Sequence, residues 1–232
     1  MNARAEAAPA RVYVWEFPVR LTHWTIVLSV LVLAGTGIYI GGPFLTVAGE
    51  AGDHFVTGTI RVIHFYAAIA FALAVLARVI WMFMGNRYAR WSQFVPVSQE
   101  RRRGIVETLR FYLFLRRDPP AVAGHNPLAG ATYVAVFGLY FLEILTGLTL
   151  YSASAPVGSP FGIFSAFIPI VGGLQTARYI HHITMWLLLG FVAHHVWSSI
   201  EVALVERNGI IESMVTGYKT GVPDEEAKSR DQ

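Results

Sequence analysis

The chain has 232 residues, a formal net charge of +3 and no cysteine. Hydrophobic residues make up 54% of it, and the mean hydropathy of +0.48 is too high for an ordinary soluble domain, which points to a membrane protein. The lack of cysteine excludes cysteine-ligated iron–sulfur clusters, covalent c-type haem and disulfides. Any metal or haem must therefore be held by histidine, methionine or carboxylate side chains.

Four apolar runs are long enough to cross a bilayer, which takes about 20 mostly apolar residues. They cover residues 21–40, 60–84, 132–151 and 179–204. A fifth apolar stretch, residues 161–174, contains proline and a glycine pair and is predicted to be a loop or an interfacial segment. We therefore expect an all-α fold, a transmembrane four-helix bundle, over residues 21–206. Residues 1–20 and 207–232 are expected to be tails, and residues 85–131 an Arg-rich loop.

Positive charge is concentrated on one side of the predicted spans. The loop between the second and third spans contains the arginines 87, 90, 101, 102, 103, 110, 116 and 117. The N-terminal tail adds arginines, whereas residues 152–177 carry no charge of either sign. By the positive-inside rule, both termini and the Arg-rich loop are predicted to be cytoplasmic, with the spans in the inner membrane. The basic run is interpreted as a topology signal rather than a nucleic-acid patch, and the tail after Tyr218 is predicted to be disordered.

The fourth apolar run contains four histidines in two adjacent pairs, His181 with His182 and His194 with His195. An α-helix advances 100° per residue, so His181 and His195 lie within about 40° of the same face and ~21 Å apart along the helix axis. That spacing suits two cofactors at two depths in the membrane. His182 and His194 face about 100° away from this stripe, and we expect them to serve helix packing or to contact haem propionates.

Helix direction assigns each of these two ligands a partner. His23 starts the first span on the cytoplasmic side, and His64 lies near the outer start of the second span. The fourth span also enters from outside, so His181 is the outer and His195 the inner residue of its stripe. The sequence therefore predicts an outer site of His64 and His181 and an inner site of His23 and His195.

Bis-histidine ligation in a four-helix bundle indicates b-type haem bound without covalent attachment, so two haem b groups are predicted. Zinc or copper would prefer three or four clustered ligands. A histidine in a membrane helix can also simply hydrogen-bond a neighbouring helix. The four histidines share the right helix faces and lie at matching depths in the membrane. Ligation of haem iron explains this better than hydrogen bonding between helices does.

Three further residues lie at telling positions in the spans. Gly37 shares a face with His23 at the depth of the outer site, where it would let a porphyrin approach the backbone or serve helix packing. Arg78 shares a face with His64 near the cytoplasmic end, where it could pair with a propionate of the inner haem or extend to the headgroups. Glu143 is an intramembrane carboxylate and so a functional candidate, with no partner evident from the sequence.

Two long motifs resemble the b-type cytochrome subunit of membrane-bound nickel–iron hydrogenases. The first is RLTHWTIVLSVLVLAGTG, residues 20–37, and the second is HHITMWLLLGFVAHH, residues 181–195. GHNPLA at residues 124–129 and MVTGYKT at residues 214–220 resemble the same family. The family's ligand positions match His23, His64, His181 and His195, in agreement with the assignment from helix geometry.

The resemblance implies a di-haem membrane anchor. Electrons from a periplasmic hydrogenase, whose large and small subunits oxidise hydrogen, would pass from the small subunit to the outer haem, cross to the inner haem and reduce quinone near the cytoplasmic face. His125 and Asn126 could hydrogen-bond a quinone carbonyl, although Asn126 and Pro127 are equally suited to start the third helix. The hydrogen-activating centre must lie in another chain, because its ligands include cysteines that this chain lacks.

Two other functions remain as alternatives. The related cytochrome b subunit of a formate dehydrogenase or thiosulfate reductase shares the four-histidine logic, although GHNPLA, the second motif and MVTGYKT favour the hydrogenase. A transporter or channel would need broken helices or a polar path through the membrane. The predicted helices are continuous, and ligand spacing accounts for their histidines.

Overall fold

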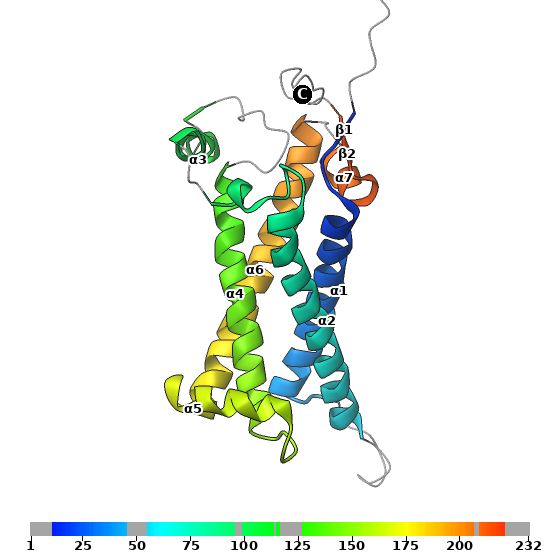
Figure 1. Cartoon of the computed structure of the whole chain (residues 1–232), viewed down its shortest axis with the longest axis vertical. Coiled ribbons are helices and arrows are strands. Elements are labelled where there is room, and N and C mark those ends of the chain that lie inside the picture. The colour runs from blue at the N-terminus through cyan, green and yellow to red at the C-terminus, as the bar shows by residue number, and fades with distance from the viewer. Residues whose placement is uncertain are drawn as a thin grey trace, which may run out of the picture. The chain divides into compact units, whose positions relative to one another are not determined.

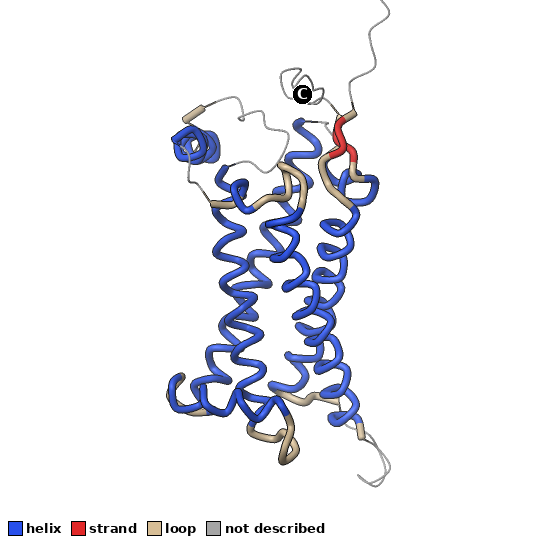
Figure 2. Tube along the Cα trace, viewed as in Figure 1, coloured by secondary structure: helices blue, strands red, loops and turns tan. Residues whose placement is uncertain are grey.

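The computed structural model describes residues 11–45, 55–95, 99–113, 115–116, 127–206 and 209–220. Helix dominates the described chain (Figure 2). The four long helices labelled in Figure 1 are α1 (Phe17–Gly41), α2 (Val56–Met84), α4 (Pro127–Ser152) and α6 (Leu174–Glu206). The shorter helical elements are η2 (Trp91–Gln93), α3 (Gln99–Tyr112), η3 (Pro160–Ala166), α5 (Phe167–Ile170) and α7 (Ile210–Thr216). Two short strands, β1 (Val12–Tyr13) and β2 (Tyr218–Lys219), complete the described elements.

The four long helices are the membrane spans. Each is long and apolar enough to cross a bilayer, and they are the candidate spans that the described residues contain. A helix satisfies all its backbone hydrogen bonds internally, which a spanning segment requires because lipid offers no partners. Large apolar side chains such as Leu28, Leu73 and Phe83 are more than 60% exposed on these helices, as lipid-facing residues are. The predicted all-α, four-helix transmembrane fold is thus confirmed, and the chain is a multi-pass membrane protein.

The fifth apolar stretch does not span. It forms η3 and α5, a helical segment of residues 160–170 that is too short to cross a bilayer. Ser159 caps η3 by accepting a hydrogen bond from the Phe161 backbone N–H, and Pro160 occupies the first turn, where its missing N–H costs nothing. The prediction that this stretch is no span is confirmed, and the structure adds that it is helical.

The described chain divides into two compact units, each built from parts of the same long helices. Unit 1 comprises Met1–Leu21, Val79–Ala135 and His194–Gln232, and unit 2 comprises Thr22–Arg78 and Val136–Ala193. Unit 1 therefore holds one end of each long helix together with the short strands, and unit 2 holds the remainder of the four helices.

Unit 2 is a closed ring of four helices. Phe71 of α2 packs edge-to-face on Tyr140 of α4, with ring centroids 5.1 Å apart. This contact belongs to an apolar cluster that also joins α1: Ile26, Val30, Leu33, Phe71, Ala74, Val75, Phe137, Tyr140 and Ile144. At the other side of the ring, α1 approaches α6 where Gly41 faces His182. With α4 bonded to α6 by Thr146 and His181, the helices follow one another in the order α1, α2, α4, α6.

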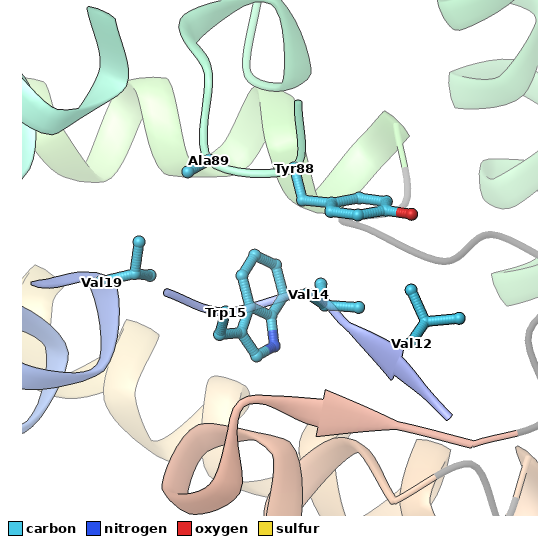
Figure 3. Close-up of a cluster of buried hydrophobic side chains, with 6 residues drawn as sticks. All are labelled: Val12, Val14, Trp15, Val19, Tyr88 and Ala89. Atoms are coloured by element: carbon cyan, nitrogen blue, oxygen red, sulfur yellow. The ribbon is translucent and has the colours of Figure 1, made fainter. Parts of the chain in front are cut away.

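Unit 1 ties the two ends of the described chain together. β1 pairs antiparallel with β2, so that Val12 lies opposite Lys219. The Trp15 indole N–H donates to the Ser213 hydroxyl over 3.1 Å. Figure 3 shows a cluster of buried side chains at this sheet, which come from β1 and the residues after it, the start of α1 and the loop after α2: Val12, Val14, Trp15, Val19, Tyr88 and Ala89. Of the C-terminal segment predicted to be disordered, residues 221–232 lie outside the described part of the chain.

A carboxylate anchors the loop after α2 in the same unit. One oxygen of Glu16 accepts hydrogen bonds from the Trp81 indole N–H at 2.9 Å and from the Asn86 backbone N–H at 2.8 Å. The Asn86 side-chain amide donates to the Val14 carbonyl, and its oxygen accepts from two following backbone N–H groups. These bonds fix the loop against the N-terminal segment.

Candidate haem site

His64 lies in the third turn of α2 and is held by α1. Its Nδ1 atom is 2.8 Å from the hydroxyl oxygen of Thr36. The Thr36 hydroxyl donates in turn to the carbonyl of Val32, one turn earlier in α1, over 2.7 Å. The imidazole is half-buried and has Nδ1 engaged, which leaves Nε2 as the ring nitrogen available to a metal.

His181 repeats this arrangement with the other two helices. Its Nδ1 atom is 2.9 Å from the hydroxyl oxygen of Thr146 on α4. The Thr146 hydroxyl donates to the Leu142 carbonyl over 2.7 Å, and the residue is fully buried. Each of the two predicted outer ligands is thus oriented by a threonine on the neighbouring helix.

A glycine lies beside each imidazole, and the one beside His181 makes room for the ring. A side-chain carbon at Gly147 of α4 would lie 3.3 Å from Cε1 of His181, closer than an ordinary van der Waals contact. A carbon at Gly37 of α1 would lie 3.5 Å from Cε1 of His64 and 3.7 Å from the sulfur of Met185 on α6. Gly37 therefore lies against a predicted ligand, at the depth where the sequence places the outer site.

Glu143 finds its partner in His181. Its Oε1 atom is 3.3 Å from Nε2 of His181, and the side chains are 16% and 19% exposed. Its second oxygen is buried and has no hydrogen-bond partner among the described residues. The Glu143 carboxyl thus contacts Nε2 of His181, the nitrogen that would bind an iron atom. This carboxyl must turn away before His181 can bind a metal.

The donor set of unit 2 fits a bis-histidine haem. His64 on α2 and His181 on α6 come from opposite corners of the ring, each with Nδ1 held by a threonine. Nε2 of His181 becomes available to a metal once Glu143 turns away. Within the described part of the chain, no three histidine, aspartate or glutamate side chains gather as a metal-ion site would need. Two opposed imidazoles in a helical bundle are the arrangement that binds b-type haem.

The other two predicted ligands belong to different units. His23, in unit 2, is half-buried on α1, and its ring meets that of Trp24 edge-on with centroids 5.3 Å apart. His195, in unit 1, is half-buried on α6, and its Nδ1 atom is 3.5 Å from the hydroxyl of Tyr133 on α4. Phe94 packs on the same tyrosine. The pairing of His23 with His195 stays a prediction.

The remaining predicted residues differ in their surroundings. His182 engages the Arg178 carbonyl through Nδ1 at 2.8 Å, and its Nε2 would lie 2.9 Å from a side-chain carbon at Gly41, so it packs helix against helix. His194 is exposed.

Arg78 is only 7% exposed, which favours a role inside the bundle over extension to the headgroups. His125 and Asn126, the predicted quinone residues, lie outside the described part of the chain.

Three hydroxyl residues of this arrangement are absent from the sequence-based prediction: Thr36, Thr146 and Tyr133. Threonine is common in membrane helices, and nothing in the linear sequence shows that one faces a histidine on another helix. The single available signal is that Thr36 lies inside the first motif, next to Gly37.

Comparison with known proteins places the chain among membrane cytochromes. Residues 14–217 match a family described as prokaryotic cytochrome b561. The chain is 40% identical to a protein of Cupriavidus necator (strain H16) named probable Ni/Fe-hydrogenase B-type cytochrome subunit, over 90% of this chain and 86% of that protein. A Bradyrhizobium diazoefficiens protein of the same name is 38% identical over 94% and 90% of the two chains. The Escherichia coli K12 protein named probable Ni/Fe-hydrogenase 1 B-type cytochrome subunit is 38% identical over 90% of each.

Proposed function

Because the chain belongs to the prokaryotic cytochrome b561 family, we propose that it is the di-haem b-type cytochrome subunit of a membrane-bound nickel–iron hydrogenase, carrying electrons from the hydrogenase small subunit to quinone. The names of its relatives in three bacteria support the link to a hydrogenase. This chain has no cysteine to hold an iron–sulfur cluster or a nickel centre, so the hydrogen-activating centre would lie in another subunit. Electrons from the large subunit would arrive through the small subunit.

One observation carries the proposal: His64 and His181 extend from opposite helices of unit 2 with Nδ1 held by a threonine in each case. These residues would hold the outer haem through Nε2. When bound, haem b supplies a one-electron redox centre that needs no covalent attachment. The chain's own part is to fix the two imidazoles and to keep the site within apolar helices.

The inner site is proposed from helix order and register. His23 would share the inner haem with His195, which follows His181 by 14 residues on the same face of α6. Arg78, which is buried on α2, is proposed to pair with a propionate of that haem. His125 and Asn126 are proposed as quinone-contacting residues.

The orientation follows from charge. The described arginines of the α2–α4 connection include Arg102, Arg103 and Arg110, which are exposed on or beside α3. By the positive-inside rule, this connection and both termini would lie in the cytoplasm, and the spans would lie in the inner membrane. The connection between α4 and α6 faces the periplasm, where the small subunit would dock.

The proposal is tested by absorption spectroscopy of native membranes, first under hydrogen and then with dithionite. Hydrogen alone should raise the α-band of reduced b-type haem, and added quinone should remove it. Membranes with His64→Ala should lose the outer part of this signal, and membranes with His182→Ala should keep it. A band raised by dithionite but not by hydrogen would show that another dehydrogenase, such as a formate dehydrogenase, supplies the electrons.

A further inference from the structure

We propose that Thr36 and Thr146 are positioning residues that fix the protonation and the ring orientation of the two outer haem ligands. The inference rests on the proposed haem function and concerns two residues outside the predicted ligand set. Thr36 lies 2.8 Å from Nδ1 of His64, and Thr146 lies 2.9 Å from Nδ1 of His181. In each pair, the threonine and the histidine come from different helices.

The hydrogen bonds from each hydroxyl to a helix carbonyl favour the imidazole as the donor in each pair. A threonine hydroxyl has one proton and two lone pairs. Thr36 gives its proton to the Val32 carbonyl at 2.7 Å, and Thr146 gives its proton to the Leu142 carbonyl at the same distance. Each hydroxyl oxygen can then only accept from the imidazole. In this arrangement Nδ1 carries the hydrogen in both histidines, and Nε2 carries the lone pair that a metal needs. At His181 this nitrogen is 3.3 Å from Oε1 of Glu143, which must turn away first.

The same bonds fix how the rings lie. A histidine ligand whose second nitrogen donates a hydrogen bond is held in one tautomer and one orientation, and becomes a more basic ligand. A more basic ligand stabilises ferric over ferrous iron and so lowers the midpoint potential of the haem. Thr36 and Thr146 would thus hold the potential of the outer haem below the value that unbonded imidazoles would give.

Helix packing is the ordinary role of a buried threonine, and α4 provides a matched comparison. Thr149, three residues beyond Thr146, is also fully buried and donates to the carbonyl four residues earlier, Leu145, over 2.7 Å. Its hydroxyl has no histidine partner among the described residues. Replacing Thr149 by valine removes a hydroxyl from the same helix without touching a predicted ligand.

The test uses the full-length protein purified from membranes in five forms: unchanged, Thr36→Val, Thr146→Val, Thr146→Ser and Thr149→Val. Three properties are measured: the midpoint potential of each haem, the g-values of the ferric haems by electron paramagnetic resonance, and the rate of haem transfer to apomyoglobin. Thr36→Val and Thr146→Val should each raise the midpoint potential of the outer haem and shift its g-values. Both variants should release haem about 10–100-fold faster than the unchanged protein. The serine variant and Thr149→Val should match the unchanged protein.

Equal behaviour of Thr146→Val and Thr149→Val would overturn the inference, since packing alone would then explain both. If a valine variant does not accumulate, the smaller alanine variant is measured in its place, and an unchanged potential there also overturns the inference. His64→Ala and His181→Ala separate this result from the proposed function. If they leave the outer haem in place, the ligand assignment itself fails; if they remove it while the threonine variants are silent, only the inference fails.

Discussion

The hydroxyl oxygen of Thr146 lies 2.9 Å from Nδ1 of His181, and this one bond couples α4 to α6 at the point where the sequence places a haem ligand. Thr36 and His64 stand in the same relation between α1 and α2, at 2.8 Å. The two bonds join the four helices of unit 2 in two pairs, each through a histidine that the sequence predicts to be a ligand. Each of these bonds joins a polar residue of one span to a predicted ligand on the next.

Haem loss should follow the predicted ligand pairs. His64→Ala or His181→Ala should each remove the outer haem, and His23→Ala or His195→Ala should each remove the inner one, because a haem with one axial ligand is held less tightly. Reduced-minus-oxidised spectra of the four variants, with redox titration to separate the haems, measure this. His182→Ala and His194→Ala are the controls and should keep both haems; loss of haem from either would show that the helical-face assignment is wrong.

Replacing the glycine beside His181 should weaken haem binding more than replacing another glycine of α4. Gly147→Ala would put a carbon 3.3 Å from Cε1 of His181 and should displace the ring by a few tenths of an ångström, so that the outer haem binds more weakly. Gly138, on the same helix, has nothing within 4 Å of such a carbon. Gly138→Ala should therefore keep full haem content. Equal haem content in the two purified variants would contradict the close packing at Gly147.

The carboxylate of Glu16 should stabilise unit 1. Glu16→Ala leaves the Trp81 indole N–H and the Asn86 backbone N–H without their acceptor, which should cost about 1–3 kcal/mol of unfolding free energy. Glu16→Gln keeps an oxygen that can accept both bonds and should cost less. Thermal unfolding in detergent, followed by circular dichroism, compares them. A glutamine variant as unstable as the alanine variant would show that charge, rather than hydrogen bonding, is what matters.

Gly217 should tolerate no side chain. Its φ of +89° disfavours any other residue, and a side-chain carbon there would lie 2.8 Å from the carbonyl oxygen of Trp15. Gly209, with a φ of +70°, meets only ordinary contacts at 3.7 Å or more. Gly209→Ala should cost about 1–2 kcal/mol, and Gly217→Ala should cost clearly more, as judged by thermal unfolding. An equal loss of stability in the two variants would mean that the backbone around Gly217 can shift to admit a side chain.

The spans could be predicted from the sequence because a bilayer demands long apolar helices and little else. Their ends could not, because helices continue past the apolar run: α1 begins at Phe17 and α6 at Leu174, before the predicted starts at residues 21 and 179. The strands were also missed. Each has two residues, and their pairing joins segments about 200 residues apart, for which no local pattern exists.

The sequence singles out the histidines of the candidate site, but it does not show their surroundings. Histidine is rare in apolar helices, so its spacing along α6 and its depth in α2 are informative in the sequence alone. Thr36 and Glu143 become significant only once the neighbouring helix is known. Glu143 was evident as an intramembrane carboxylate, but its partner His181 lies 38 residues further along the chain, on another helix.

The central claim is that this chain binds two b-type haems through four histidines. The most direct measurement is the haem content of the purified full-length chain, from the pyridine haemochrome spectrum against protein from quantitative amino-acid analysis. We expect two haem b per chain, falling to one in His64→Ala and to none in the double variant His64→Ala with His195→Ala. One haem in the unchanged protein, or two remaining in His64→Ala, would contradict it.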